Sequence, residues 1–401
     1  MFSNKPLIGK EKKTAVRFPD AAVFCLEENA DRRTETEKFQ KLPGADAPPA
    51  SRRQPVLWPE RSGKTNLLEA IHYCSLGRSH RISNDANVVK NGETFALSSV
   101  FIQNMLGKRE IAVRFHPDEI QKKIILIDQK RISKFSDMMG CLRCVIFSPE
   151  DLGLIREGPS MRRRYLDMMI SQISRGYFIA LQQYRTGMDQ RNAVLRNLRA
   201  NGSGNLSILS AFEETMAEPA EVIIRERRKI VSFLSEIAAD TYRRISDTEE
   251  VFRIAYHSSV KEENDVTETL CRLLRENRED DIRMGLTSVG PHREDLYLTL
   301  NKNQMKQFAS QGQIRTAALS MKLSQMKILR DLSREEPVLL LDDVMSELDR
   351  KRRTCLIGEI SDFQTFITCA ERSDVECEKI DRVWEVKTDN SEAEVREMHN
   401  A

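Results

Sequence analysis

Two adjacent carboxylates, Asp342 and Asp343, directly follow the apolar run Val338–Leu341. An apolar run without polar alternation predicts a short strand buried on both faces. Acids at the end of such a strand are costly unless the site needs negative charge or a base. The pair therefore predicts Asp342 as a Mg²⁺ ligand and Asp343 as the catalytic group that activates water. A core strand that leads into an N-capped helix explains the same residues, so both interpretations are open at this point.

A second segment, Gly63-Lys64-Thr65, has the composition of the latter half of a phosphate-binding loop. Lys64 would reach the β- and γ-phosphates, and the Thr65 hydroxyl would bind Mg²⁺. Asn66 follows in the first turn of a helix whose N-terminus would present free N–H groups to phosphate. The run after Thr65 places four apolar residues on one helical face: Leu67, Leu68, Ile71 and Cys74.

A third segment, Ser310-Gln-Gly-Gln313, stands before another helix-like run. Such a turn at a helix start is a second place where backbone N–H groups and a hydroxyl can meet phosphate. Ser310, Gly312 and Gln313 are the predicted contacts. The segment Ser346-Glu-Leu-Asp349 follows the paired acids. Each motif is short, and their order along the chain is the informative observation.

That order is the order of motifs in ATP-binding-cassette heads. Further segments make the chain resemble the RecF family of bacterial recombination and repair proteins: Phe147–Leu152, Gly158-Pro159, Arg162–Asp167, Gln190–Asn192, Thr287–Asp295 and Gln364–Thr368. The resemblance extends over most of the chain, from Gly63 to Thr368.

The resemblance implies an α/β fold, a P-loop head of the ATP-binding-cassette type with an inserted antiparallel helical lobe, as in Rad50 and SMC heads. The expected boundaries are a first part of the ATPase domain at residues 58–157, the helical lobe at 158–285, the second part at 286–389 and a polar tail at 390–401. Three β-rich runs, at 95–102, 110–115 and 122–127, predict an antiparallel element on the nucleotide-binding core. Asn201–Gly204 predicts a turn between two long helices, the second with Val222, Ile223, Ile230, Phe233 and Ile237 on its apolar face.

The resemblance also implies ATP and Mg²⁺ as cofactors, bound between two protomers. Lys64 and Thr65 would come from one protomer and Ser310 and Gly312 from the other, so ATP would favour a head-to-tail homodimer. The resemblance implies a slow, DNA-stimulated ATPase at most. Thr368 stands where other cassette proteins place a histidine that senses the γ-phosphate; a structural strand-end hydroxyl is the favoured interpretation.

DNA is the third expected ligand, in single-stranded or gapped form. The resemblance implies RecO- and RecR-like partners, loading of the recombinase RecA and a contribution to the SOS response. Because 63 basic residues face 61 acidic ones, any DNA surface must come from local clustering. The candidates for phosphate contact lie in two helical segments: Arg162, Arg163 and Arg164, then Arg225, Arg227, Arg228 and Lys229. For any one arginine, a solvated helix face or an internal ion pair is the favoured explanation. His292 and Arg293 have no assigned role.

The first 57 residues depart from the pattern. A phosphate-binding loop has glycine five residues before Gly63, and this chain has Trp58 there, followed by Pro59, which has no N–H to donate. The Pro/Ala/Arg-rich stretch before them predicts an unstructured segment. We therefore expect residues 1–57 to be disordered or translated from a shifted reading frame, with a remodelled nucleotide pocket as the alternative. The functional alternative is a non-catalytic DNA-binding remnant. A cassette transporter subunit is disfavoured by the RecF-like segments.

Composition favours a cytosolic protein. The chain has 40% hydrophobic and 31% charged residues, and no apolar run approaches membrane-spanning length. No apolar segment of a secretory signal follows the basic N-terminal residues. Among eight cysteines, Cys141 and Cys144 form a single C-x-x-C without a second pair, so reduced thiols are favoured over a zinc or redox site. We expect a cytoplasmic protein without a membrane partner.

Overall fold

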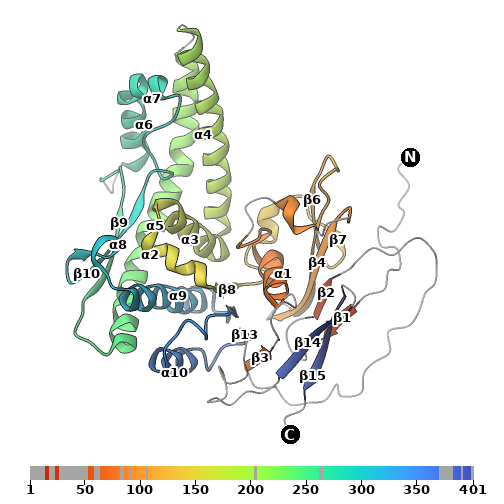
Figure 1. The fold of residues 1–401 in the computed structure, drawn as a ribbon. Coiled ribbons are helices and arrows are strands. Elements are labelled where there is room, and N and C mark those ends of the chain that lie inside the picture. Colours follow the sequence, from red (N-terminus) through yellow and green to blue (C-terminus); the bar gives the residue numbers. More distant parts are fainter. Residues whose placement is uncertain are drawn as a thin grey trace, which may run out of the picture. The chain divides into compact units, whose positions relative to one another are not determined.

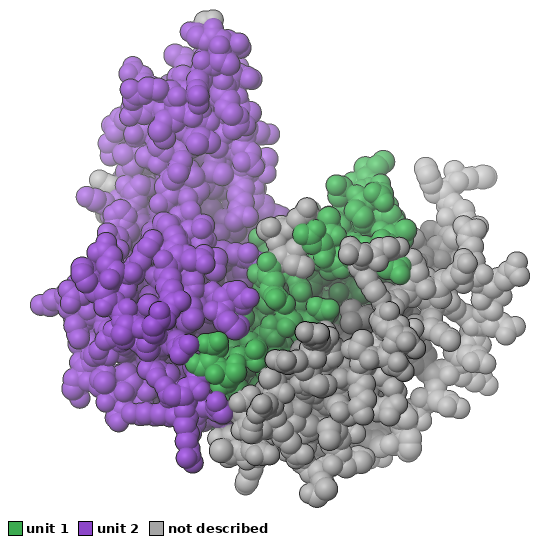
Figure 2. Space-filling view, viewed as in Figure 1, with its two compact units in different colours: residues 1–148, 337–347, 360–401 green, residues 149–336, 348–359 purple. Residues whose placement is uncertain are grey.

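The computed structural model describes residues 14–17, 23–26, 53–57, 64–81, 85–89, 93–104, 107–202, 206–261, 265–369, 383–389 and 392–398. The chain divides into two compact units (Figure 2). Unit 1 comprises residues 1–148, 337–347 and 360–401, and unit 2 comprises residues 149–336 and 348–359. No helix in these described ranges is long and apolar enough to cross a membrane.

Unit 1 contains a mainly parallel sheet. Its strand order is β15 (Glu392–Met398), β14 (Val383–Asp389), β3 (Arg53–Leu57), β13 (Thr365–Cys369), β12 (Val338–Asp342) and β8 (Cys144–Phe147). All neighbours pair in parallel except β14 and β15. Leu339, Leu340 and Leu341 are fully buried, which confirms the strand predicted from the apolar run. Because the strands are parallel, the carboxyl ends of β3, β13 and β12 meet at one edge of the sheet.

The second sheet of unit 1 is antiparallel. Its order is β1 (Thr14–Arg17), β2 (Val23–Leu26), β4 (Ala96–Asn104), β5 (Gly107–Phe115), β6 (Lys123–Ile127) and β7 (Lys130–Arg131). The three β-rich runs of the sequence are confirmed as β4, β5 and β6. Asp128 and Gln129 both have positive φ, which suits the two-residue turn between β6 and β7. Two 3₁₀ helices, η1 (Asp85–Val88) and η2 (Phe135–Asp137), complete this unit.

Helix α1 (Lys64–Leu76) packs against both sheets of unit 1. Its four predicted apolar residues are at most 5% exposed. They share one core with residues of the antiparallel sheet and of the parallel sheet: Val100, Ile111, Val113, Cys144, Ile146, Leu340 and Phe366. Burial on both sides fixes the position of the helix that begins at Lys64.

Unit 2 is built on three helices: α3 (Pro159–Ile173), α4 (Arg175–Asn201) and α5 (Ser207–Ser246). Helices α4 and α5 lie side by side as an antiparallel hairpin (Figure 1). The predicted end of the first helix is confirmed, because α4 ends at Asn201 and Gly202 follows in the left-handed conformation. Helices α6 (Val266–Glu276) and α7 (Arg278–Met284) pack on α5 and α4. The predicted apolar face of α5 is partly wrong, since Val222 and Phe233 are exposed although Ile223 and Ile230 are buried.

The remainder of unit 2 contains a three-stranded antiparallel sheet ordered β11 (Asn303–Gln304), β10 (Asp295–Leu300) and β9 (Phe252–His257). Its other elements are η3 (Pro149–Leu152), α2 (Gly153–Arg156), α8 (Met305–Phe308), α9 (Gln311–Ser333) and α10 (Arg350–Glu359). Helix α9 packs along α5. Residues 286–336 therefore group with the helical hairpin, whereas the sequence boundaries placed them in the second part of the ATPase domain.

Two segments that the sequence predicted to lack structure contain strands. Within residues 1–57, β2 pairs with β4 and β3 pairs with β13, so at these residues the prediction of disorder is wrong. Within the predicted tail, β15 pairs with β14 over its whole length. Distant strands supply the backbone partners in both cases, and local composition does not reveal them. Trp58, Pro59 and Gly63 lie outside the described residues.

Candidate functional site

The carboxyl edge of the parallel sheet in unit 1 brings the predicted phosphate-loop helix and the paired acids together. Strand β3 ends at Leu57 and α1 begins at Lys64, so a strand precedes the helix as a phosphate-binding loop requires. The first N–H groups of α1 have no partner within the helix, so this end favours an anion. Asn66, in the first turn, is exposed.

Thr65 and Asp342 are in direct contact although 277 positions separate them. The Thr65 hydroxyl donates a hydrogen bond of 3.0 Å to Asp342 Oδ1. The Thr368 hydroxyl donates to the same oxygen, also at 3.0 Å. Asp342 is 6% exposed, and these two hydroxyls offset part of the cost of burying its charge.

Asp343 leaves the strand in a different conformation. Its φ is +54°, in the left-handed region that aspartate tolerates better than most residues. Its N–H donates to the Thr368 hydroxyl at 3.1 Å, and its carbonyl accepts from the Ser346 hydroxyl at 2.9 Å. Thr368 thus holds both acids of the pair, which agrees with the structural interpretation of its hydroxyl.

The donor set at this edge fits Mg²⁺. A threonine hydroxyl and a carboxylate are hard oxygen ligands, and Mg²⁺ commonly takes one or two protein oxygens beside waters and phosphate oxygens. Thr65 and Asp342 are already within 3.0 Å of each other. Within the described ranges, no group of three or more His, Cys, Asp or Glu side chains is placed to hold a metal by itself. A Mg²⁺ ion held by Thr65 and Asp342 would complete its coordination with water or phosphate oxygens.

The Ser310 turn, in unit 2, forms the N-terminus of α9. The Ser310 hydroxyl accepts from the Gln313 backbone N–H at 3.3 Å, and the Gln313 side-chain oxygen accepts from the Ser310 N–H at 2.8 Å. This reciprocal pair is a capping box. Ser310 is exposed and Gly312 and Gln313 are half-buried, so the sequence-predicted contacts of this segment lie together on one helix end.

The segment Ser346–Asp349 is divided between the two units. Ser346 belongs to unit 1, and Asp349 belongs to unit 2. Asp349 caps α10 by accepting from the Arg352 N–H at 3.0 Å, and this hydrogen bond lowers the pKa of the Asp349 carboxyl. Arg352 pairs with Asp349 and also donates to the Gly312 carbonyl at 3.2 Å and to the Thr316 hydroxyl at 2.8 Å. Within unit 2, Asp349 is therefore connected to the Ser310 turn.

Burial removes two of the predicted DNA contacts. Arg162 is 6% exposed and forms a bidentate ion pair with Asp295, with N···O distances of 2.7 and 2.8 Å. Arg227 is 2% exposed and donates to Asp167 at 2.8 Å and to the Pro291 carbonyl at 2.7 Å. Both predictions are wrong, because a guanidinium enclosed by its own chain cannot reach a phosphate.

The other predicted DNA contacts keep part of their surface. Arg163, Arg164 and Arg228 are half-buried. Arg163 donates to the Glu294 carbonyl at 2.9 Å, and burial lowers the pKa of its guanidinium. Burial likewise lowers the pKa of Arg164. Arg228 donates to the Val260 carbonyl. Arg225 and Lys229 are exposed, and Arg225 forms an ion pair with Glu221.

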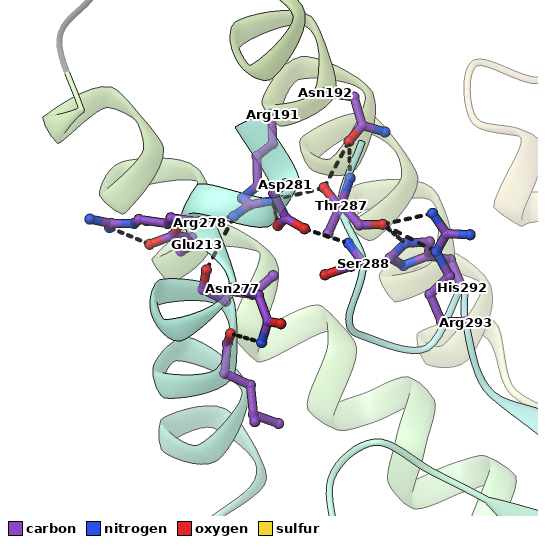
Figure 3. Close-up of polar contacts among 12 residues, drawn as sticks. Arg191, Asn192, Glu213, Asn277, Arg278, Asp281, Thr287, Ser288, His292 and Arg293 are labelled. Atoms are coloured by element: carbon purple, nitrogen blue, oxygen red, sulfur yellow. Dashed lines mark hydrogen bonds and ion pairs between the residues drawn. The ribbon is translucent and has the colours of Figure 1, made fainter. Parts of the chain in front are cut away.

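A buried polar network joins two of the segments noted in the sequence (Figure 3). Arg191, fully buried, donates to Asp281 at 2.6 Å, to Glu213 at 3.1 Å and to the Thr287 hydroxyl at 2.9 Å. Asn192 accepts from the Thr287 N–H at 2.8 Å. The network ties α4, α5 and α7 to the loop at residues 287–294, so these segments hold unit 2 together.

His292 belongs to the same loop. One ring nitrogen lies 2.9 Å from the Thr287 carbonyl, which can only accept, so Nε2 carries the proton. Nδ1 then accepts from the Tyr184 hydroxyl at 2.7 Å. Burial lowers the pKa of His292 to about 4. The sequence assigned this residue no role, and the structure makes it a neutral link between α4 and the loop.

Three known proteins with sequences similar to this chain carry the same name. The chain is 36% identical over 306 residues to the DNA replication and repair protein RecF of Clostridium novyi, with 76% of this chain and 83% of that protein covered. It is 38% identical over 311 residues to RecF of Clostridium tetani (77% and 83%) and 37% identical over 315 residues to RecF of Acetivibrio thermocellus (77% and 85%). No family model matches the chain.

Two solved structures resemble the fold. One is the structure of the recombination mediator protein RecF-ATP in the RecFOR pathway, with a TM-score of 0.78, 34% identity and coverage of 86% of this chain and 92% of that one. The other is the corresponding RecF-ATPrS structure, with a TM-score of 0.77, 35% identity and the same coverage. These likenesses confirm the predicted fold class, an α/β head of the ATP-binding-cassette type.

Proposed function

Because this chain belongs to the RecF family of DNA replication and repair proteins, we propose that it binds DNA in an ATP-dependent way during recombinational repair and replication restart. The observation that carries the proposal is the hydrogen bond between Thr65 and Asp342, which brings a phosphate-loop helix and a strand-end acid into one site. The relatives that were solved as RecF-ATP and RecF-ATPrS support ATP as the nucleotide.

In this proposal, α1 presents its N-terminus to the phosphates of ATP, and Lys64 contributes positive charge there. When bound, Mg²⁺ supplies charge that neutralises the β- and γ-phosphates. Thr65 and Asp342 would hold it, directly or through water. Asp343, at the exposed end of β12, orients or deprotonates the attacking water, and Thr368 keeps both acids in place.

The proposed dimer completes the site. Ser310 and Gly312 of a second copy meet the nucleotide held by the first copy, so phosphate contacts are complete only in the dimer. ATP binding therefore favours the dimer and hydrolysis releases it, because a ligand shifts an equilibrium by its differential affinity for the two states. A slow, DNA-stimulated ATPase of this kind acts as a timed clamp.

The proposed nucleic-acid ligand is single-stranded or gapped DNA in the cytoplasm. Contacts to phosphates give affinity without sequence information. With Arg162 and Arg227 excluded, five candidates remain in the two helical segments: Arg163, Arg164, Arg225, Arg228 and Lys229. The RecFOR pathway named for the solved relatives supports RecO- and RecR-like partners. As the family resemblance implies, we further propose that the chain acts with them in loading RecA and in the SOS response.

A fluorescent-ATP titration tests the nucleotide part of the proposal. The wild type and a Lys108→Ala control, which changes an exposed lysine of β5, should bind ATP and dimerise, whereas Lys64→Ala should do neither. No binding by the wild type at about 1 mM ATP would remove the clamp mechanism. If DNA binding then persisted, the second candidate function would hold, a non-catalytic DNA-binding remnant. The departures from the phosphate-binding loop at Trp58 and Pro59 are the reason for considering it.

A salt titration tests the DNA part. Affinity for a gapped oligonucleotide should fall linearly with salt on logarithmic axes, and each lost phosphate contact should lower the slope by about 1. Arg163→Ala and Arg228→Ala should each reduce the slope, while Arg272→Ala serves as the control because it removes an exposed arginine of α6 that is paired with Glu276 and is not among the candidates. Unchanged slopes in both test variants would contradict the proposal that Arg163 and Arg228 contact DNA phosphates.

A further inference from the structure

The side chain of Gln313 is held at both ends within its own chain. Its oxygen accepts from the Ser310 N–H at 2.8 Å, and its amide nitrogen donates to Glu250 Oε1 at 2.6 Å. A backbone N–H can only donate and a carboxylate can only accept, so these partners determine the orientation of the amide. A flipped amide would lose both hydrogen bonds and place like groups against each other.

Glu250 is in turn fixed by the end of α5. Its second oxygen, Oε2, accepts from the Tyr242 hydroxyl at 3.0 Å and from the Thr248 hydroxyl at 3.1 Å. Tyr242 is fully buried in the last turns of α5. Glu250 follows the C-cap of α5, Asp247, by three residues. The carboxylate therefore bridges the 40-residue helix of the hairpin and the first turn of α9.

Further ion pairs hold α10 against the same end of α5. Lys351 pairs with Asp247 at 2.9 Å, and Arg244 pairs with Glu359. Arg352, also on α10, donates to the Gly312 carbonyl at 3.2 Å. The Ser310 turn is thus contacted by a carboxylate that extends from α5 and by a guanidinium from α10.

We propose that Gln313 is a positioning residue rather than a nucleotide ligand, and that Glu250 positions the Ser310 turn through it. The inference rests on the proposed function of this turn as the phosphate contact from the second protomer. Movement of the end of α5 changes the position of Glu250, and the Ser310 N–H and hydroxyl follow through Gln313. The hairpin and the phosphate contact are therefore linked by one charge-assisted hydrogen bond.

An exchange of the two side-chain types tests this directly. Gln313→Glu keeps the capping box, because glutamate accepts from the N-cap N–H as glutamine does. It places a second carboxylate against Glu250, where the wild type has a 2.6 Å hydrogen bond. Adding Glu250→Gln should restore the contact with its direction reversed. The amide introduced at position 250 donates to the carboxylate introduced at position 313, and the amide oxygen accepts from Tyr242 and Thr248.

Two readouts are needed. Amide hydrogen exchange of residues 310–313, measured without nucleotide, should be about tenfold faster in Gln313→Glu and near wild type in the double variant. ATP-dependent dimerisation should weaken about ten- to a hundredfold in Gln313→Glu and return to within about threefold in the double variant, since a hydrogen bond to a charged group is worth about 1.5–3 kcal/mol. Nucleotide affinity of the monomer should change in neither.

The outcomes separate the two proposals. If exchange follows this pattern but the wild type neither binds ATP nor dimerises, the positioning pair stands and the proposed function fails. If Gln313→Glu behaves as wild type, or if the double variant is no better than Gln313→Glu in both readouts, the inference is wrong. Glu250→Ala provides a second variant, and it should accelerate exchange at residues 310–313 as Gln313→Glu does.

Discussion

The Thr368 hydroxyl offers a direct measure of how firmly the paired acids are held. Thr368→Val keeps the shape of the side chain and removes one hydrogen bond to the Asp342 carboxylate and one from the Asp343 N–H. The first is worth about 1.5–3 kcal/mol, and an orphaned N–H costs about 1–3 kcal/mol. Thr65 still donates to Asp342 and Asp343 is exposed, so we take the low ends and expect a loss of about 2–3 kcal/mol.

Scanning calorimetry measures this loss. At roughly 2–4 °C per kcal/mol for a unit of this size, the melting temperature of Thr368→Val should fall by about 5–10 °C. The matched control is Thr368→Ser, which keeps the hydroxyl and loses one methyl group, at a cost of about 1 kcal/mol. ATP affinity should fall in the valine variant, because Asp342 loses one of its two hydroxyl partners. A valine variant that melts within about 1 °C of wild type would refute the reasoning.

Three further predictions concern unit 2. Arg191→Ala removes the ion-pair partner of the buried Asp281 and one of the two arginines that pair with the buried Glu213, the other being Arg278. It should cost about 3–5 kcal/mol in urea unfolding, and a loss below about 1 kcal/mol would contradict the network. His292 has a pKa of about 4 when folded, below the ordinary value near 6.5. As the pH falls, the unfolded chain binds this proton first, so the wild type should lose about 3 kcal/mol between about pH 6.5 and 4. A His292→Gln variant should lack that part of the slope, and identical slopes would be evidence against it. Gly290→Ala should destabilise more than Gly202→Ala by calorimetry: Gly290 has φ +121° and its Cβ would lie 2.4 Å from the Tyr184 hydroxyl, whereas the Cβ of Gly202 would meet nothing within 4 Å. Equal melting temperatures would contradict that difference.

Local patterns predicted the elements that carry the candidate site. The apolar spacing after Thr65 and the unbroken apolar run before Asp342 became α1 and β12. The contact between Thr65 and Asp342 lies beyond local pattern, and it was predicted because motif order resembled a known family. The predicted contacts Ser310, Gly312 and Gln313 are adjacent in sequence and remain together on one helix turn.

Local patterns failed where partners come from far along the chain. Arg162 and Arg227 look like solvent-facing helix charges, yet Asp295 lies 133 positions from Arg162 and Asp167 lies 60 positions from Arg227. No sequence signal marks Glu250 as the partner of Gln313. In the same way, β2 and β3 gained partners that their Pro/Ala/Arg-rich surroundings do not reveal.

The amino-acid sequence alone determined which residues are chemically suited to a site and which helix or strand lies beside each of them. Hydrophobic spacing and capping reveal these elements because they act over a few neighbouring positions. Tertiary structure decided which charges are available. From the sequence, an arginine can equally well contact a phosphate of DNA or form an ion pair within the protein. The carboxylate that decides between these two roles becomes its neighbour only when distant segments of the chain pack together. Because Arg162 and Arg227 are removed from water, each guanidinium needs a charged partner within the protein. Thr65, Asp342 and the Ser310 turn instead lie at the ends of helices and strands, where a ligand can contact them.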